Sequence, residues 1–165
     1  YEMKKRDRDG LILFMVCIFL LSFFGSIHAE DKKDMGGWGL NDPYNKLYDA
    51  GDVEQRKVVV VDVKEIVPLP EMSPGVALVV KEDEEGGEFL VHLCPVWYKT
   101  PEKIGIRKGD KISLRGYSAE INGEEVIMAA KIKKKGKTLK FRLTSDGMPF
   151  WTMTPAQLQK ELSSE

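Results

Sequence analysis

Hydrophobic residues recur along the chain in short runs separated by glycine, proline and charged residues. The first run, 56–67, is rich in β-branched side chains, with five valines among the eight residues from Lys57 to Lys64. Further runs follow at 76–80, 88–93, 111–117, 124–133 and 138–143. Short β-branched or alternating runs of this kind are typical of strands. The pattern therefore predicts six strands, of which the first is the longest.

The connections between these runs narrow the choice of fold. Asn122-Gly123 is a strong signal for a type I′ hairpin turn, and the charged residues 82–87 connect the second and third runs. An irregular stretch, 94–107, separates the third run from the fourth. We therefore predict a mostly β fold, a small five- to six-stranded OB-fold-like barrel with short flanking helices. An SH3-like barrel or an open sandwich is the alternative.

Two short helices are expected outside the strands. Asp42-Pro43 is suited to begin a helix, with Asp42 as the N-cap, and the spacing of Tyr44, Leu47 and Tyr48 places them on one face that covers the domain. Near the other end, Thr154-Pro155 followed by Gln157 has the pattern of a capping box. The sequence thus predicts a lid before the barrel and a small C-terminal helix.

The first 29 residues have the pattern of a secretory signal peptide. A basic stretch precedes an apolar run at 11–24, and Ala29 is followed by acidic residues. We expect cleavage after Ala29, which would give a periplasmic or secreted protein; an uncleaved N-terminal anchor is the alternative. The remaining chain divides into a flexible lead and short helix at 30–52, the barrel at 53–151, and a helix and tail at 152–165.

Composition and motifs exclude several functional classes. The 165 residues carry 25 Lys and Arg against 26 Asp and Glu, so there is no overall basic field to bind nucleic acid. Two cysteines and two histidines are too few for a disulfide scaffold or a cysteine-based zinc site. No P-loop, dinucleotide, nucleophile-elbow, zinc-protease or haem-attachment motif occurs. We therefore expect no enzyme and no cofactor.

The run Val91–Tyr98, VHLCPVWY, gathers most of the residues suited to chemistry in the exported part. Its candidate ligand- or partner-binding residues are His92, Cys94, Trp97 and Tyr98. Strand alternation predicts that His92 leaves the core face, beside aromatic side chains that form a stacking platform or pocket at the barrel rim. Alternatively, the aromatic residues only plug the barrel end. His92 and Cys94 lie two apart, but no third ligand or orienting group accompanies them, so we predict neither a metal site nor a catalytic residue.

A basic segment lies near the end of the predicted barrel. Its members are Lys131, Lys133, Lys134, Lys135, Lys137, Lys140 and Arg142. Such a segment can attract an anionic partner, but lysines also protect exposed strand edges from pairing, and we favour this second interpretation. The acidic run 82–85 is likewise interpreted as a solvated turn.

Four segments together resemble the C-terminal domain of the magnetosome proteins MamS and MamX. They are YNKLYDA at 44–50, VHLCPVWY at 91–98, GDKISLRGY at 109–117 and LKFRLTSDGMPFW at 139–151. The resemblance implies an exported barrel of OB type, related to proteins that take part in the maturation of iron crystals. Some of those proteins carry a CxxCH haem motif, which this chain lacks. His92, Trp97 and Tyr98 match the motif, whereas Cys94 stands where the family usually has glycine.

These observations predict a periplasmic, non-enzymatic binding or accessory module. It would use the barrel rim to hold a small ligand or a partner protein in the cell envelope, with no nucleic acid bound and membrane contact only through an uncleaved N-terminal segment. Two alternatives remain open: a redox or metal-linked accessory factor of a cytochrome or iron system, and a structural subunit of an envelope assembly.

Overall fold

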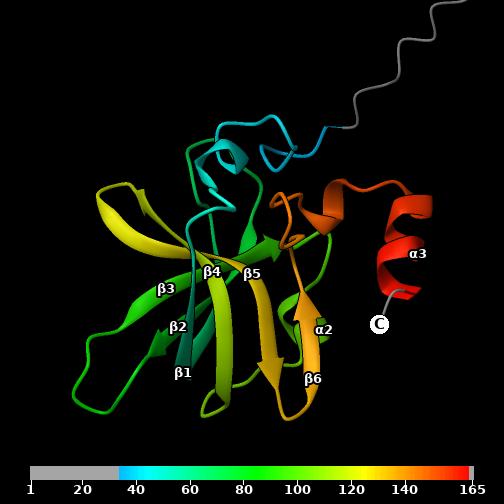
Figure 1. Ribbon diagram of the computed structural model, residues 1–165. Coiled ribbons are helices and arrows are strands. Elements are labelled where there is room, and N and C mark those ends of the chain that lie inside the picture. The colour runs from blue at the N-terminus through cyan, green and yellow to red at the C-terminus, as the bar shows by residue number, and fades with distance from the viewer. Residues whose placement is uncertain (1–33, 164–165) are drawn as a thin grey trace, which may run out of the picture. The chain divides into compact units, whose positions relative to one another are not determined.

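A computed structural model describes residues 34–163 of the chain (Figure 1). The expected signal peptide lies outside the described residues. The elements, in chain order, are the 3-10 helix η1 (Asn45–Leu47), β1 (Val53–Ile66), β2 (Gly75–Lys81), β3 (Phe89–Pro95), α2 (Pro101–Ile104), β4 (Lys111–Ile121), β5 (Glu124–Lys134), β6 (Lys137–Lys140), the 3-10 helix η2 (Phe150–Thr152) and α3 (Pro155–Ser163). All six predicted strands are present, and β4 extends four residues beyond its expected end.

Five of the strands close into a ring. The sheet order is β3-β2-β1-β4-β5-β6, and a parallel pairing of β3 with β5 joins the two ends of the first five strands. The other pairings are antiparallel. This is the Greek-key ring of an OB-fold barrel, so the predicted fold class is confirmed. Closure leaves β6 as an additional strand attached to the outside edge of β5.

The barrel interior is built from alternate positions of its strands. Because successive strand residues point to opposite faces, one set of side chains fills the interior and the other faces outward. The interior set includes the buried residues Val58, Val60, Val76, Leu78, Val80, Val91, Leu93, Ile112, Leu114 and Ile132. Their β-branched and leucine side chains explain both the strand propensity of these runs and the stability of the closed sheet.

Two predicted local features are confirmed by backbone geometry. Asn122 and Gly123 have φ of 54° and 78°, the conformation that a type I′ turn requires. At α3, the Thr154 hydroxyl accepts a hydrogen bond from the Gln157 backbone N–H, and the Gln157 side chain accepts one from the Thr154 backbone N–H. This reciprocal pair is the predicted capping box.

The short helix predicted after Asp42 is present, but it is shorter than expected and Asp42 is not its N-cap. Only the three-residue η1 forms, and its N-cap is Tyr44, without a side-chain hydrogen bond. Asp42 instead accepts a hydrogen bond from the Gly39 backbone N–H at 2.6 Å, which closes a turn before the helix. Tyr44 is buried but Leu47 is 37% exposed, so they do not share a covering face. The short α2 was not predicted.

The segment expected to be a flexible lead contains a fully buried tryptophan. The Trp38 indole N–H donates to the Ser73 carbonyl at 2.9 Å, and its ring lies so close to Gly75 that a Cβ there would clash with it. Trp151, near the other end of the described chain, donates its indole N–H to the Trp38 carbonyl at 2.9 Å. The two ends of the domain therefore pack together beside the barrel, over the start of β2 (Figure 1).

Candidate functional site

His92 lies on β3, on the outward side of the alternation that buries Val91 and Leu93 inside the barrel. It is nevertheless only 4% exposed, because Tyr44 covers it. The two rings stack with centroids 6.0 Å apart, and the Tyr44 hydroxyl lies 3.2 Å from His92 Nδ1. Burial, together with the positive charge of Lys64, lowers the pKa of His92 to about 4. The imidazole is therefore neutral at physiological pH.

A small groove lies beside His92, between the loop after β1 and the turn between β4 and β5. It has a volume of about 120 Å³, and its lining includes Val67, Pro68, Leu90, His92 and Asn122. The Asn122 side chain donates to the Pro68 carbonyl at 3.1 Å, which ties the two loops together. OB folds bind ligands on the face of the second and third strands, between these same two loops. The predicted rim residue His92 therefore borders the position where this fold usually binds.

Cys94 lies at the end of β3 and is completely buried. Its thiol donates a long hydrogen bond of 3.9 Å to the Lys99 carbonyl, and burial raises the pKa of the thiol to about 12. Since the thiolate is the form that attacks substrates and binds metals, a protonated buried thiol is poorly suited to either task. A bulge between β2 and β3 falls just before Cys94 and disturbs the simple alternation on which a paired His92–Cys94 site depends.

Trp97 and Tyr98 follow β3 in a turn and are closer to the surface. Trp97 is 44% exposed, and Tyr98 is half-buried against Trp151, with ring centroids 6.0 Å apart. The Lys99 ammonium lies 5.4 Å from the centre of the Tyr98 ring. Tyr98 lines a second groove, of about 310 Å³, between β6 and α3. Of the four predicted residues, two are thus buried and two lie near the surface, and His92 and Tyr98 border different hollows.

Sequence reasoning treated Arg142 only as part of a basic run, but the structure buries it beside the same cluster. Its guanidinium donates to Asn45 Oδ1 at 2.6 Å and to the Gly147 carbonyl at 3.3 Å. It also lies 4.7 Å from the centre of the Tyr48 ring and 5.2 Å from that of Trp151. Burial lowers the pKa of Arg142, and its interactions with Tyr44 and Tyr48 partly oppose this shift. Arg142 thereby holds the lead segment against the C-terminal segment.

Lys134, another member of the predicted basic segment, is also engaged. Its ammonium contacts Asp110 at 2.5 Å and donates to the Gly105 carbonyl at 2.9 Å. Arg142 and Lys134 therefore have structural roles, and the predicted basic segment does not act as a unit.

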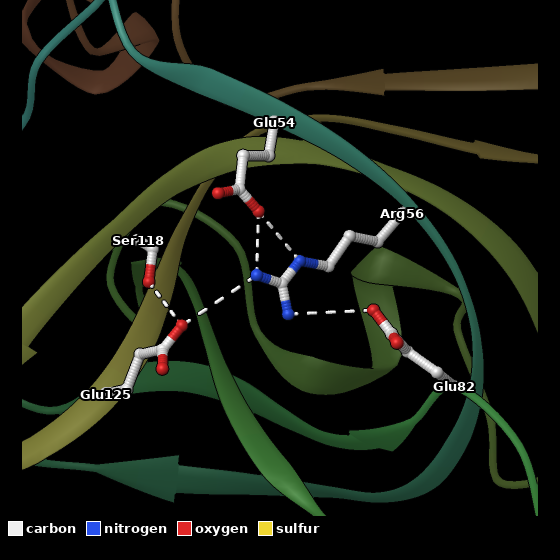
Figure 2. A network of polar contacts seen from close by, with 5 residues as sticks. All are labelled: Glu54, Arg56, Glu82, Ser118 and Glu125. Atoms are coloured by element: carbon white, nitrogen blue, oxygen red, sulfur yellow. Dashed lines mark hydrogen bonds and ion pairs between the residues drawn. The ribbon is translucent and has the colours of Figure 1, made fainter. Parts of the chain in front are cut away.

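A cluster of charged side chains surrounds Arg56 on β1 (Figure 2). Its guanidinium contacts Glu54 at 2.7 Å, Glu82 at 3.5 Å and Glu125 at 3.8 Å. Ser118 donates a hydrogen bond of 2.7 Å to Glu125, and the guanidinium also lies 5.6 Å from the centre of the Phe89 ring. One cation thus links β1, the turn after β2, and the β4–β5 hairpin. Its main effect is to fix these elements relative to one another.

Residues 34–163 offer neither a group of metal ligands nor a membrane-spanning helix. No group of three or more histidine, cysteine or acidic side chains in this range is arranged to hold a metal ion. No helix in the same range combines the length and hydropathy needed to cross a membrane.

Comparison with known proteins identifies a family. The family model of the MamS/MamX magnetosome protein family matches residues 52–139, which is more than half of the chain. The matched range begins just before β1 and ends in β6, so it contains the whole closed barrel and the run Val91–Tyr98. No curated protein and no solved structure matches the chain.

Proposed function

Because the chain belongs to the MamS/MamX magnetosome protein family, we propose that it is a magnetosome-associated accessory protein that acts by binding. It works after export, on the periplasmic side of the envelope, and its partner is a protein rather than a reacting substrate. The barrel provides a rigid support, and the turn after β3 supplies the binding residues.

The exposed indole of Trp97 is the observation that carries this proposal. Trp97 lies two residues after the end of β3, in a turn in which the Tyr98 and Lys99 backbone N–H groups donate to the carbonyl of Pro95, the last residue of that strand. Tryptophan is among the residues that contribute most to protein interfaces, because it buries a large apolar area at a small entropic cost. Half-buried Tyr98 and the nearby Lys99 ammonium add an aromatic surface and a charge beside it.

Replacing Trp97 by alanine tests the proposal. Leu40 is the matched control, because its exposed fraction of 45% is almost the same as that of Trp97 at 44%. Both variants are used to recover partners from the envelope fraction of the native host after chemical crosslinking. We expect Trp97→Ala to reduce recovery of the partner at least about tenfold, as loss of an anchor worth more than 1.4 kcal/mol would do. Leu40→Ala should recover it normally.

Equal recovery by the folded Trp97→Ala variant would contradict the proposed binding surface. Folding is checked by circular dichroism, which also separates loss of binding from loss of structure. Recovery that falls equally in both variants would indicate general hydrophobic adhesion rather than a specific contact.

The redox or metal-linked alternative is less well supported. It depends on His92 and Cys94, but His92 is engaged by Tyr44 and the Cys94 thiol is buried and protonated at neutral pH. Metal analysis of the purified protein, with Cys94→Ser for comparison, distinguishes this alternative from the binding proposal. Metal bound in a Cys94-dependent manner would favour the alternative.

A further inference from the structure

Four of the cations on the outward face of β1, β4 and β5 lie in two adjacent rows of paired residues. Strand pairing places Arg115 directly opposite Lys131, and Ser113 lies between Lys57 and Lys133 in the next row. These residues alternate with buried Ile112, Leu114 and Ile132, so their side chains point away from the barrel interior. Arg115, from β4, and Lys57, from β1, did not belong to the basic segment predicted from the sequence.

Carboxylates do not compensate these charges. Within residues 34–163, none of Lys57, Arg115, Lys131 and Lys133 forms an ion pair. Like charges directly opposite each other on neighbouring strands are unfavourable. The arrangement therefore costs stability unless something outside this part of the chain neutralises it.

Edge protection does not explain the position of these cations. Lysines that block edge-to-edge pairing are useful on strands with an unpaired edge. Lys131 and Lys133 lie on β5, which pairs with both β4 and β6, and Arg115 lies on β4, which pairs with both β1 and β5. The cations thus stand in the middle of the sheet, where no strand edge needs protection.

The same residues border a hollow of about 90 Å³. Its lining is Gln55, Ser113, Arg115, Lys131 and Lys133. The Gln55 amide donates to the Ser113 hydroxyl at 3.2 Å, so two neutral hydrogen-bonding groups lie beside three cations. Neighbouring strands are about 4.8 Å apart and alternate residues of one strand about 6.7 Å apart, so the three long side chains can all reach one small anion.

We propose that this hollow, lined by Arg115, Lys131, Lys133, Ser113 and Gln55, binds a phosphate group. A guanidinium gives paired hydrogen bonds to phosphate oxygens, and lysines add charge without fixed geometry. The ligand chemistry is a phosphate, either as a free ion or as the headgroup of an anionic lipid. The site is independent of the turn that holds Trp97.

The experiment titrates the full chain with inorganic phosphate at constant ionic strength and follows backbone amide shifts by NMR. A second arm measures binding to phosphatidylglycerol vesicles, with phosphatidylcholine vesicles as the reference for any apolar contribution. The test variant is Arg115→Gln combined with Lys131→Gln. The control is Lys103→Gln combined with Lys108→Gln, which removes the same charge from exposed positions outside the hollow.

We expect saturable shifts that centre on β4 and β5, with the affinity reduced at least tenfold in the test variant and unchanged in the control. Vesicle binding with the same dependence on the variants, without binding of the free ion, would identify the lipid headgroup as the source. The proposal is overturned if the chain binds neither phosphate form, or if the two double variants weaken binding equally. Amide spectra of each variant show directly whether it is folded.

Discussion

Positively charged side chains have different surroundings on the two faces of the same strands. On β1, Arg56 lies on the same face of the strand as buried Val58 and Val60, and three carboxylates surround its guanidinium (Figure 2). One residue along, Lys57 faces outward, in a group of cations that have no carboxylate partner among residues 34–163. In the first arrangement the cation is surrounded by more negative charge than it carries. The second leaves charge to be balanced by water, salt or a ligand.

This difference separates a structural cluster from a candidate binding surface. A cation already held by three carboxylates gains little from a further anion, and its partners belong to elements that must stay in place. Unpaired cations in the middle of a sheet reduce stability, yet they are available to a ligand. A third arrangement is seen at His92, which also points outward but is covered by Tyr44 and stays uncharged.

The largest expected effect is on the pH dependence of the free energy of unfolding, and it comes from His92, the covered position in this comparison. The pKa of His92 is about 4 in the folded protein against about 6.5 in an unfolded chain, so the unfolded state binds the proton more readily. The contribution that neutral His92 makes to the free energy of unfolding is therefore fully present above pH 6.5. It is lost as the pH falls toward 4, by up to about 3 kcal/mol. Urea unfolding between pH 7 and 4 measures it. In His92→Gln, this part of the pH dependence should disappear, and an unchanged slope would contradict the assignment.

An intermediate effect is expected from Arg56→Gln. The substitution leaves Glu54, Glu82 and Glu125 near one another without their shared cation, and should reduce the free energy of unfolding by about 1–2 kcal/mol. High salt should recover part of the loss, because it screens the repulsion between the carboxylates. Arg107→Gln, an exposed position outside the cluster, serves as the control. A loss that does not respond to salt would indicate that packing against Phe89 dominates.

The smallest expected effect is an increase in the free energy of unfolding rather than a decrease. Lys131→Glu places a carboxylate directly opposite Arg115 and should raise the free energy of unfolding by about 0.5 kcal/mol, with a gain that shrinks at high salt. The denaturant midpoint of the variant is compared with that of Lys108→Glu, which makes the same charge change in an exposed turn. Destabilisation by Lys131→Glu would contradict the view that the outward cations reduce stability, because Lys131 would then be stabilising the fold.

Most of the fold could be predicted because its signals are local. Valine-rich runs, the Asn122-Gly123 turn and the Thr154–Gln157 capping box depend on residues within a few positions of one another, and each is present. The extent and N-cap of the helix after Asp42 were predicted wrongly for the complementary reason. Tyr44 packs against Trp38 and contacts His92, which lies 48 residues away along the chain, and these contacts do not follow from the helical spacing of the segment.

The candidate site was predictable only in part. The sequence identifies His92, Cys94, Trp97 and Tyr98 as unusual neighbours, but it does not show which of them are covered. Coverage comes from Tyr44 and Trp151, which lie dozens of residues away. The role of Arg142 could not be predicted for a similar reason. A lysine-rich run gives no indication that its one arginine is buried and donates a hydrogen bond to Asn45.

The sequence by itself determined the strands, their turns and the class of the barrel, since alternation and turn chemistry act over short distances. Only the tertiary structure decided which charges meet. Strand register brings Arg115 beside Lys131 and Glu125 beside Arg56, although each pair is separated along the chain. Charge interactions depend on distance in space. The position that the closed sheet gives a lysine or arginine therefore decides whether it is buried among hydrogen-bond acceptors, surrounded by carboxylates or left on an open cationic face.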